Sequence, residues 1–70
     1  MFRPNRRYRH MSCVDVDFVI DGILGETETY LSVILRAWHR TLKGSITRPF
    51  VAEIKKSEFD KWKEMPSEVS

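Results

Sequence analysis

The sequence has few of the features that stabilise very small proteins from outside their hydrophobic core. It contains a single cysteine, so no disulfide can form within the chain, and its two separated histidines make no metal-binding motif. Seventy residues form one domain that buries only about 60% of its unfolded surface. The core alone therefore leaves little margin of stability, and we expect help from a second copy of the chain or from another protein.

Long hydrophobic runs are also missing. Phe18–Ile20 and Val33–Leu35 are typical of the runs present, whereas a membrane-spanning helix needs about 18 apolar residues. No apolar stretch of signal-peptide length follows the basic N-terminal residues. With one thiol and no such signal, we expect a cytoplasmic protein that has no membrane partner.

Recognisable catalytic motifs are absent as well. The segment 22–25, Gly-Ile-Leu-Gly, lacks the third glycine and the lysine of a phosphate-binding loop. No Ser-His-Asp order, paired-cysteine motif or HExxH helix is present. We therefore expect a protein that is not an enzyme and that carries no cofactor.

Positive charge is concentrated at the N-terminus. Residues 1–10 hold four arginines and no acid, whereas residues 11–70 hold eight Lys or Arg against ten Asp or Glu. This pattern predicts a basic, flexible arm over 1–10, a single domain over 11–66 and a frayed tail over 67–70. Such an arm can neutralise phosphates or stack on bases. Its candidate nucleic-acid contacts are Arg3, Arg6, Arg7, Tyr8 and Arg9.

The first regular segment alternates apolar and polar residues. From Cys13 to Asp21, every second residue is apolar and the aspartates lie on the opposite face, which predicts a half-buried strand over 13–21. A second alternation, together with Pro49, predicts another strand over 46–55. Ser57 and Asp60 have the spacing of a capping box, so a short helix is expected over 57–65, ending before Pro66.

The intervening segment, 27–43, decides the fold class. At 100° per residue its apolar side chains fill one arc and its polar side chains the other, with Thr41 as the one polar intruder. Thr27 is a suitable N-cap and Gly44 a suitable left-handed C-terminal residue. The distribution of charge also matches the helix dipole, with acids near the start and cations near the end.

These observations predict a helix over 27–43 and a β-α-β-α domain of α+β or small α/β class, with parallel strands. The alternative is a three-stranded antiparallel meander followed by the C-terminal helix. In it, alternate residues of 31–37 would face Phe50, Ala52 and Ile54 across a turn at Lys43-Gly44.

One set of charged residues suggests metal chemistry. Asp21 ends the first predicted strand, and Glu53-Ile54-Lys55 lies in the second. The combination of an aspartate with Glu-x-Lys resembles the metal site of the PD-(D/E)xK nucleases, although no proline precedes Asp21. The resemblance implies that Asp21 and Glu53 would hold Mg²⁺ and that Lys55 would orient water or stabilise charge.

Taken together, these features favour a small non-enzymatic regulatory protein that acts by binding another protein, with homodimerisation as one form of that binding. Nucleic-acid binding through the N-terminal arginines is the first alternative. A metal-dependent nuclease site at Asp21, Glu53 and Lys55 is the second. The candidate protein-interaction residues are Phe59, Trp62, Arg36, His39 and Arg40.

Overall fold

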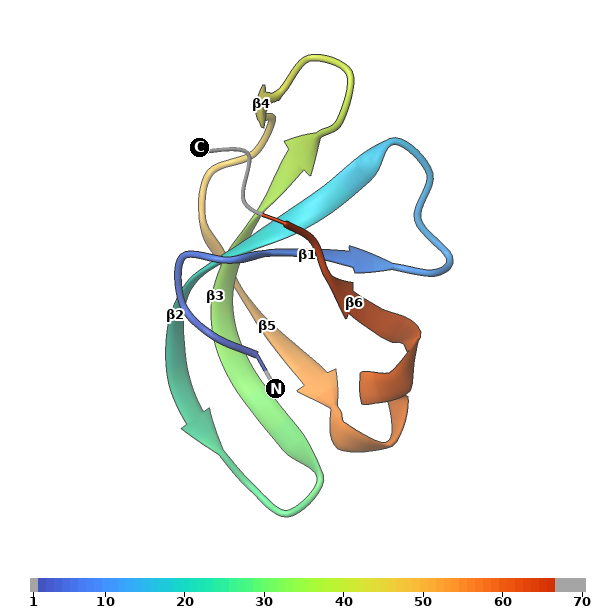
Figure 1. Ribbon diagram of the computed structural model, residues 1–70. Coiled ribbons are helices and arrows are strands. Elements are labelled where there is room, and N and C mark those ends of the chain that lie inside the picture. Colours follow the sequence, from blue (N-terminus) through green and yellow to red (C-terminus); the bar gives the residue numbers. More distant parts are fainter. Residues whose placement is uncertain (1, 67–70) are drawn as a thin grey trace.

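Antiparallel strands dominate the computed structural model, which describes residues 2–66 (Figure 1). Strands make up 55% of these residues, and no helix among them reaches seven residues. The predicted β-α-β-α domain is therefore wrong, and so are its helices over 27–43 and 57–65. In chain order the elements are β1 (Arg7–His10), β2 (Val16–Glu26), β3 (Tyr30–His39), β4 (Gly44–Ser45), β5 (Phe50–Lys55), the 3₁₀-helix η1 (Lys56–Lys61) and β6 (Trp62–Glu64).

The strands form one sheet in the order β4-β3-β2-β1-β6, and β5 pairs with β3 beyond the end of β4. Every pairing is antiparallel, which contradicts the expected parallel crossover. The segment read as a helix is the central strand, β3. Its contacts with β5 match the pairing of the meander alternative: Leu31 lies opposite Ile54, Val33 opposite Ala52 and Leu35 opposite Phe50.

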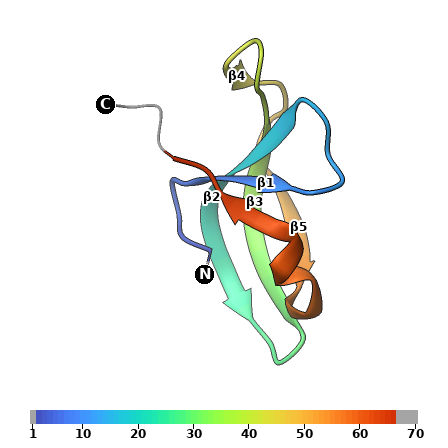
Figure 2. The ribbon, with the colours of Figure 1, turned by 45° about the vertical axis from the view of Figure 1, so that its right-hand side comes forward.

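The long strand β2 allows the sheet to curl. Its first half pairs with both β1 and β3, whereas Gly22–Glu26 pairs with β3 alone. The register with β3 shifts after Ile20 and again after Ile23, and such bulges bend a strand and increase its twist. In Figures 1 and 2, β1 accordingly lies at a steep angle to the lower parts of β2 and β3.

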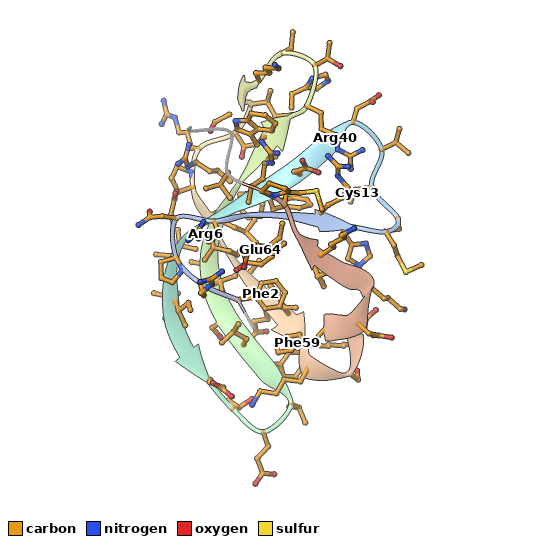
Figure 3. The ribbon with its side chains drawn as sticks, in the orientation of Figure 1. Phe2, Arg6, Cys13, Arg40, Phe59 and Glu64 are labelled. Atoms are coloured by element: carbon orange, nitrogen blue, oxygen red, sulfur yellow. The ribbon has the colours of Figure 1, made fainter. Side chains whose placement is uncertain are left out.

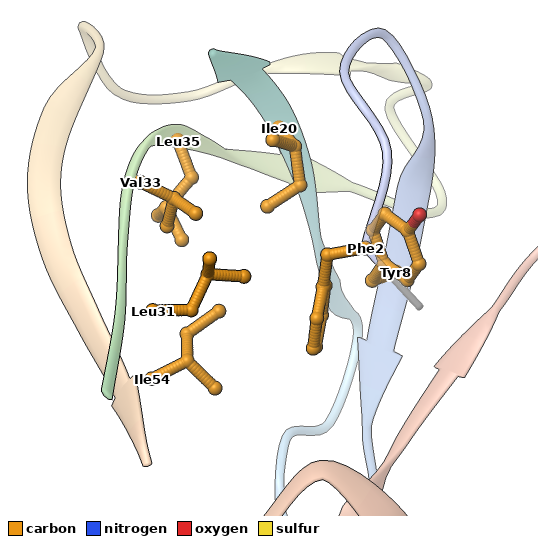
Figure 4. Packing of buried hydrophobic residues seen from close by; sticks show 7 residues of the cluster. All are labelled: Phe2, Tyr8, Ile20, Leu31, Val33, Leu35 and Ile54. Atoms are coloured by element: carbon orange, nitrogen blue, oxygen red, sulfur yellow. The ribbon is translucent and has the colours of Figure 1, made fainter. Parts of the chain in front are cut away.

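The hydrophobic core lies on the concave side of this curl (Figure 4). Ile20 of β2 and Val33 of β3 are completely buried, and alternate residues of β3 point into the core while their neighbours are half-buried on the other side. The buried cluster comprises Phe2, Tyr8, Ile20, Leu31, Val33, Leu35 and Ile54.

The N-terminal segment is built into the fold. Arg7–His10 forms β1, between β2 and β6, and Phe2 and Tyr8 are buried in the core. The Tyr8 hydroxyl accepts a hydrogen bond from the Arg3 backbone N–H at 2.7 Å and donates one to Glu64 at 3.1 Å. The segment predicted as a basic arm over 1–10 thus contributes a strand and two core residues within residues 2–10.

The residues predicted to cap a helix instead shape turns. Thr27 Oγ1 accepts hydrogen bonds from the backbone N–H groups of Thr29 and Tyr30, closing the β2–β3 turn. Threonine hydroxyls favour turns for the same reason that they favour N-caps. Gly44 is in β4, and its neighbour Lys43 takes the left-handed conformation, with φ of 56°.

The C-terminal segment also differs from its prediction. Residues 56–61 form a 3₁₀-helix without a side-chain cap, so Ser57 does not begin a capping box. Residues 62–64 then pair with β1 as a sixth strand. The predicted frayed tail, 67–70, lies outside the described residues.

Candidate functional site

The convex side of the sheet carries a layer of cations. Because β-strand side chains alternate between faces, residues that neighbour a core residue in sequence point outward. One row across this face contains, in register, Lys63 of β6, Arg9 of β1, Asp17 of β2, Trp38 of β3 and Ser45 of β4. The next row contains Arg7, Val19 and Arg36. We define the outer basic face as Arg7, Arg9, Arg36, Arg40 and Lys63.

Asp17 is the centre of this face and is completely buried beneath it. Arg9 donates two hydrogen bonds to its carboxylate, from Nε at 2.9 Å and from Nη2 at 3.2 Å. Arg40 donates a third from Nε at 2.8 Å, and Nε of Arg7 lies 3.3 Å from the carboxylate. A single aspartate therefore fixes three guanidinium groups from β1 and from the end of β3.

The ionisation of Asp17 depends on these arginines. Burial pushes the pKa of its carboxyl upward, because it disfavours the charged form. Hydrogen bonds from Arg9 and Arg40 act in the opposite direction and outweigh burial, so the pKa lies below its usual value. Asp17 is consequently a carboxylate at neutral pH, and it neutralises only one of its three cationic partners.

Arg40 also ties the β1–β2 loop to the end of β3. Its Nη2 donates to the carbonyl oxygen of Cys13 at 3.2 Å, and its backbone N–H donates to the carbonyl of Asp15 at 2.9 Å. Figure 3 shows the Arg40 side chain beside Cys13. Asp15 takes a left-handed backbone conformation, with φ of 64°, which aspartate tolerates better than most residues. The loop conformation thus helps to hold the guanidinium on the outer basic face.

A second carboxylate positions Arg36. Nε of Arg36 lies 2.9 Å from one oxygen of Asp21 and 3.0 Å from the other, and its Nη1 donates to the Ser45 hydroxyl at 2.5 Å. Among the residues that the structure describes, the outer basic face therefore combines five cations with the two carboxylates Asp17 and Asp21. Lys63 lies directly opposite Arg9, and like charges in this position repel.

Trp38 is the aromatic residue in the row. The guanidinium of Arg7 lies over its ring, with Cζ 4.3 Å from the ring centroid, a cation–π arrangement. This contact explains how a half-buried tryptophan is accommodated on the outward side of β3. It also occupies the ring face on which a nucleobase could otherwise stack.

The contact residues predicted from the sequence do not all lie on one surface. Arg7 and Arg9, expected to bind nucleic acid, share the outer basic face with Arg36 and Arg40, expected to bind protein. Tyr8 lies in the core, and Arg3 forms an ion pair with Glu64 at 2.7 Å. The backbone carbonyl of Arg6 accepts a hydrogen bond from the N–H of Ile20. His39 ends β3, where its Nδ1 accepts a hydrogen bond from Leu42 N–H at 3.2 Å.

Phe59 and Trp62 lie on the core side of the sheet. The ring of Phe2 packs edge-on against both, with centroids 4.9 Å from Phe59 and 5.7 Å from Trp62. Trp62 also contacts the rings of Phe18 and His10. Figure 3 shows Phe2 and Phe59 side by side. These aromatic residues therefore pack against the core while each keeps part of its surface exposed.

The nuclease-like triad is not assembled. Asp21 is on β2 and Glu53 is on β5, and these two strands flank β3 on opposite edges. Asp21 binds Arg36, whereas Glu53 lies opposite Ser32. Within residues 2–66 no group of three or more His, Cys, Asp or Glu side chains is placed to hold a metal ion. In the predicted parallel arrangement, Asp21 and Glu53 would instead lie near the same ends of neighbouring strands.

Three members of the site were missed by sequence reasoning. The sequence pattern predicts Asp17 on the polar face of a strand, Trp38 on the apolar arc of the helix over 27–43 and Lys63 in the short helix over 57–65. The alternation around Asp17 was the available signal, because it placed a carboxylate on the face opposite the core. Its arginine partners could be identified only with the order of the strands known.

Comparisons of the chain with protein-family models, curated proteins and solved structures gave no match. Of the residues described, none belongs to a helix long and apolar enough to span a membrane.

Proposed function

We propose that this protein is a small non-enzymatic binding protein whose outer basic face binds the phosphate backbone of a nucleic acid. The observation that carries the proposal is the set of three guanidinium groups fixed on one buried carboxylate. Arginines held in this way are preorganised, and the side chains of Arg9 and Arg40 stay partly exposed, where an anion can reach them. Lys63 lies directly opposite Arg9, so the two cations repel each other. A phosphate bound between them would offset this repulsion.

The face is suited to phosphates rather than to bases. Proteins that bind single strands stack bases on open aromatic rings, and here the Trp38 ring lies beneath Arg7. Arg9 follows Arg7 by two positions along β1, a spacing of about 7 Å. Each strand of a duplex carries one charge per about 3.4 Å, so neighbouring rows of cations can follow its backbone.

The distribution of acids supports the same assignment. Glu26 and Glu28 lie at the β2–β3 turn, and Glu58 and Asp60 lie in η1. Glu26 and Glu28 lie towards the opposite end of the β2–β3 pair from the rows that carry Arg7, Arg9 and Arg36, whereas Asp60 precedes Lys63 by only three residues. A polyanion can therefore approach those arginines without first meeting the carboxylates of the β2–β3 turn.

Protein binding, the first function expected from the sequence, remains a prediction, and so do its docking residues. Phe59 and Trp62 pack against the core and are half-buried. The specific observation in its favour is the exposed edge of strand β5. A cytoplasmic location and the absence of enzymatic activity also stay predictions.

Salt dependence provides the direct test. Binding of a fluorescent DNA or RNA duplex is followed by anisotropy from low to moderate salt, with the matched single strand in parallel. We expect duplex affinity to fall steeply with salt, with a log–log slope of about −0.9 for each phosphate contacted. Arg36→Gln and Lys63→Gln should each reduce that slope by about one.

Lys61→Gln provides the matched control, because Lys61 is an exposed cation of η1 paired with Glu58. It removes the same charge from the whole molecule while leaving the outer basic face intact. Absent binding, or equal losses for Lys61→Gln and Lys63→Gln, would contradict the proposal. Tighter binding of the single strand would contradict its backbone-recognition part.

A further inference from the structure

The strand β5 has one unused edge. Among residues 2–66 it pairs only with β3, and no proline interrupts Phe50–Lys55. Two of its apolar side chains are exposed, Phe50 at 42% and Val51 at 65%. Unpaired edges of this kind are templates for another strand. This edge is separate from the outer basic face, so an interaction through it does not depend on nucleic-acid binding.

The hydrogen bonds identify the backbone groups on that edge. Lys56 N–H donates to the carbonyl of Thr29 at 2.9 Å, immediately beyond the pair formed by Tyr30 and Lys55. In an antiparallel ladder, successive residues direct their backbone groups to opposite edges. The groups of Ile54, Ala52 and Phe50 are therefore directed towards β3. Those of Lys55, Glu53 and Val51 are directed towards the unused edge.

The side chains on the outward face of β5 are complementary to themselves. Glu53 and Lys55 are exposed, and neither takes part in an ion pair within the described part of the chain. In an antiparallel pair centred on Ile54, Glu53 of each copy lies opposite Lys55 of the other. Cross-strand pairs of opposite charge are stabilising. A register centred on Glu53 would instead place two glutamates together.

We propose that β5 pairs with β5 of a second copy, in antiparallel fashion and centred on Ile54, to form a two-fold symmetric dimer. The two pairs of Glu53 and Lys55 exchange backbone hydrogen bonds, and their side chains form two ion pairs. A two-fold interface uses the same patch on both subunits and has to be complementary to itself. The alternation of acid and base along β5 satisfies that requirement.

A charge-reversal series tests the dimer. The solution mass of the full chain is measured by sedimentation equilibrium from micromolar to millimolar concentration. The wild type should reach twice 8.3 kDa. Glu53→Lys and Lys55→Glu should each weaken association by about tenfold or more, because two attractive pairs become repulsive. The double variant, with both changes, should restore it.

Glu28→Lys provides a matched control, because it makes the same charge reversal at an exposed glutamate of the β2–β3 turn. It should leave the mass of the dimer unchanged. A wild type that stays monomeric at millimolar concentration overturns the proposal. So does a dimer that survives both single reversals, or a double variant that remains monomeric. Each outcome is independent of nucleic-acid binding, which is measured separately.

Discussion

Asp17 shows how one side chain organises a surface in a protein with a very small core. It is buried, yet it lies on the outward face of β2, where Arg7, Arg9 and Arg40 cover it. Each arginine keeps part of its side chain in contact with water. The aspartate therefore reduces the mutual repulsion of the guanidiniums without neutralising all of them, which leaves the face cationic.

Asp17→Asn should destabilise the fold strongly. Without the carboxylate, three guanidiniums face one another across an amide that can accept fewer hydrogen bonds. Breaking a buried ion pair from one side costs about 3–5 kcal/mol, and we expect the lower end because the arginines can regain water. Urea denaturation measures this loss as a change in the free energy of unfolding.

Asp15→Asn is the control for that measurement. Asp15 is exposed, and asparagine also accepts the left-handed backbone found there. We expect a change within about 0.5 kcal/mol, as for most surface substitutions. Equal effects of Asp15→Asn and Asp17→Asn would show that Asp17 is not the centre of the face.

Tyr8 should make the free energy of unfolding depend on pH in the alkaline range. Burial raises the pKa of its phenol, since the charged form loses hydration. The folded state then holds the proton more tightly than the unfolded state. The stabilisation is complete below the unfolded pKa of about 10 and is lost as the pH rises through the higher folded value.

Denaturation of wild type and Tyr8→Phe across this range measures the effect. The phenylalanine variant loses the hydrogen bonds to Arg3 and Glu64, so it should be less stable at neutral pH. The difference between the two proteins should shrink above pH ~10. A difference that stays constant through that range would argue against a protonated, buried Tyr8.

At the scale of elements, β3 is where sequence reasoning failed. Its hydrophobic residues satisfy a helical arc because both faces of this central strand are covered. The core covers Leu31, Val33 and Leu35, and the arginine layer partly covers Trp38. Strands covered on both faces have nearly continuous hydrophobic runs. Such a run carries no clear period of two, and short-range pattern cannot separate it from a helix.

The charges near β3 gave a second misleading signal. Glu26 and Arg36 match the dipole of a helix, but in the structure Glu26 pairs with Lys56 and Arg36 with Asp21. The first contact joins β2 to η1 and the second joins β2 to β3, so both depend on the topology. By contrast, β2 and β5 have one clearly polar face over part of their length. The alternation of Phe18 with Asp17, and of Ile54 with Glu53, was therefore sufficient to predict strands there.

Paired threonine substitutions distinguish the strand from the helix. Val33 is completely buried, whereas its neighbour Ile34 is half-buried on the outer side. Val33→Thr places a hydroxyl in the core and should cost about 1–3 kcal/mol. Ile34→Thr should cost less than about 1 kcal/mol, because its side chain remains near water. A helix with both residues on its apolar arc would make the two losses similar, and thermal or urea denaturation measures them.

At the scale of the whole molecule, the two proposed surfaces are geometrically compatible. Residues directly opposite each other across an antiparallel pair lie on the same face of the sheet. A β5–β5 dimer would therefore keep the outer basic faces of both copies on the same side. One copy is 35 Å along its longest axis, which is about the length of ten base pairs at 3.4 Å each. A duplex of about twice that length could contact both copies at once.

Duplex length should therefore affect affinity more than the number of overlapping sites can explain. The second contact becomes intramolecular, and bivalency of this kind can raise affinity by about 10²–10⁴-fold when the geometry allows both contacts. The measurement is the ratio of affinities for duplexes of about 20 and about 10 base pairs in the wild type and in Lys55→Glu. The ratio cancels the effect of the altered charge on each separate contact. We expect a large ratio for the dimer and, for the dissociated variant, only the ratio set by the number of overlapping sites on the two duplexes. A wild-type ratio equal to that of the variant, in a protein shown to dimerise and to bind the short duplex, would mean that the two faces do not act together.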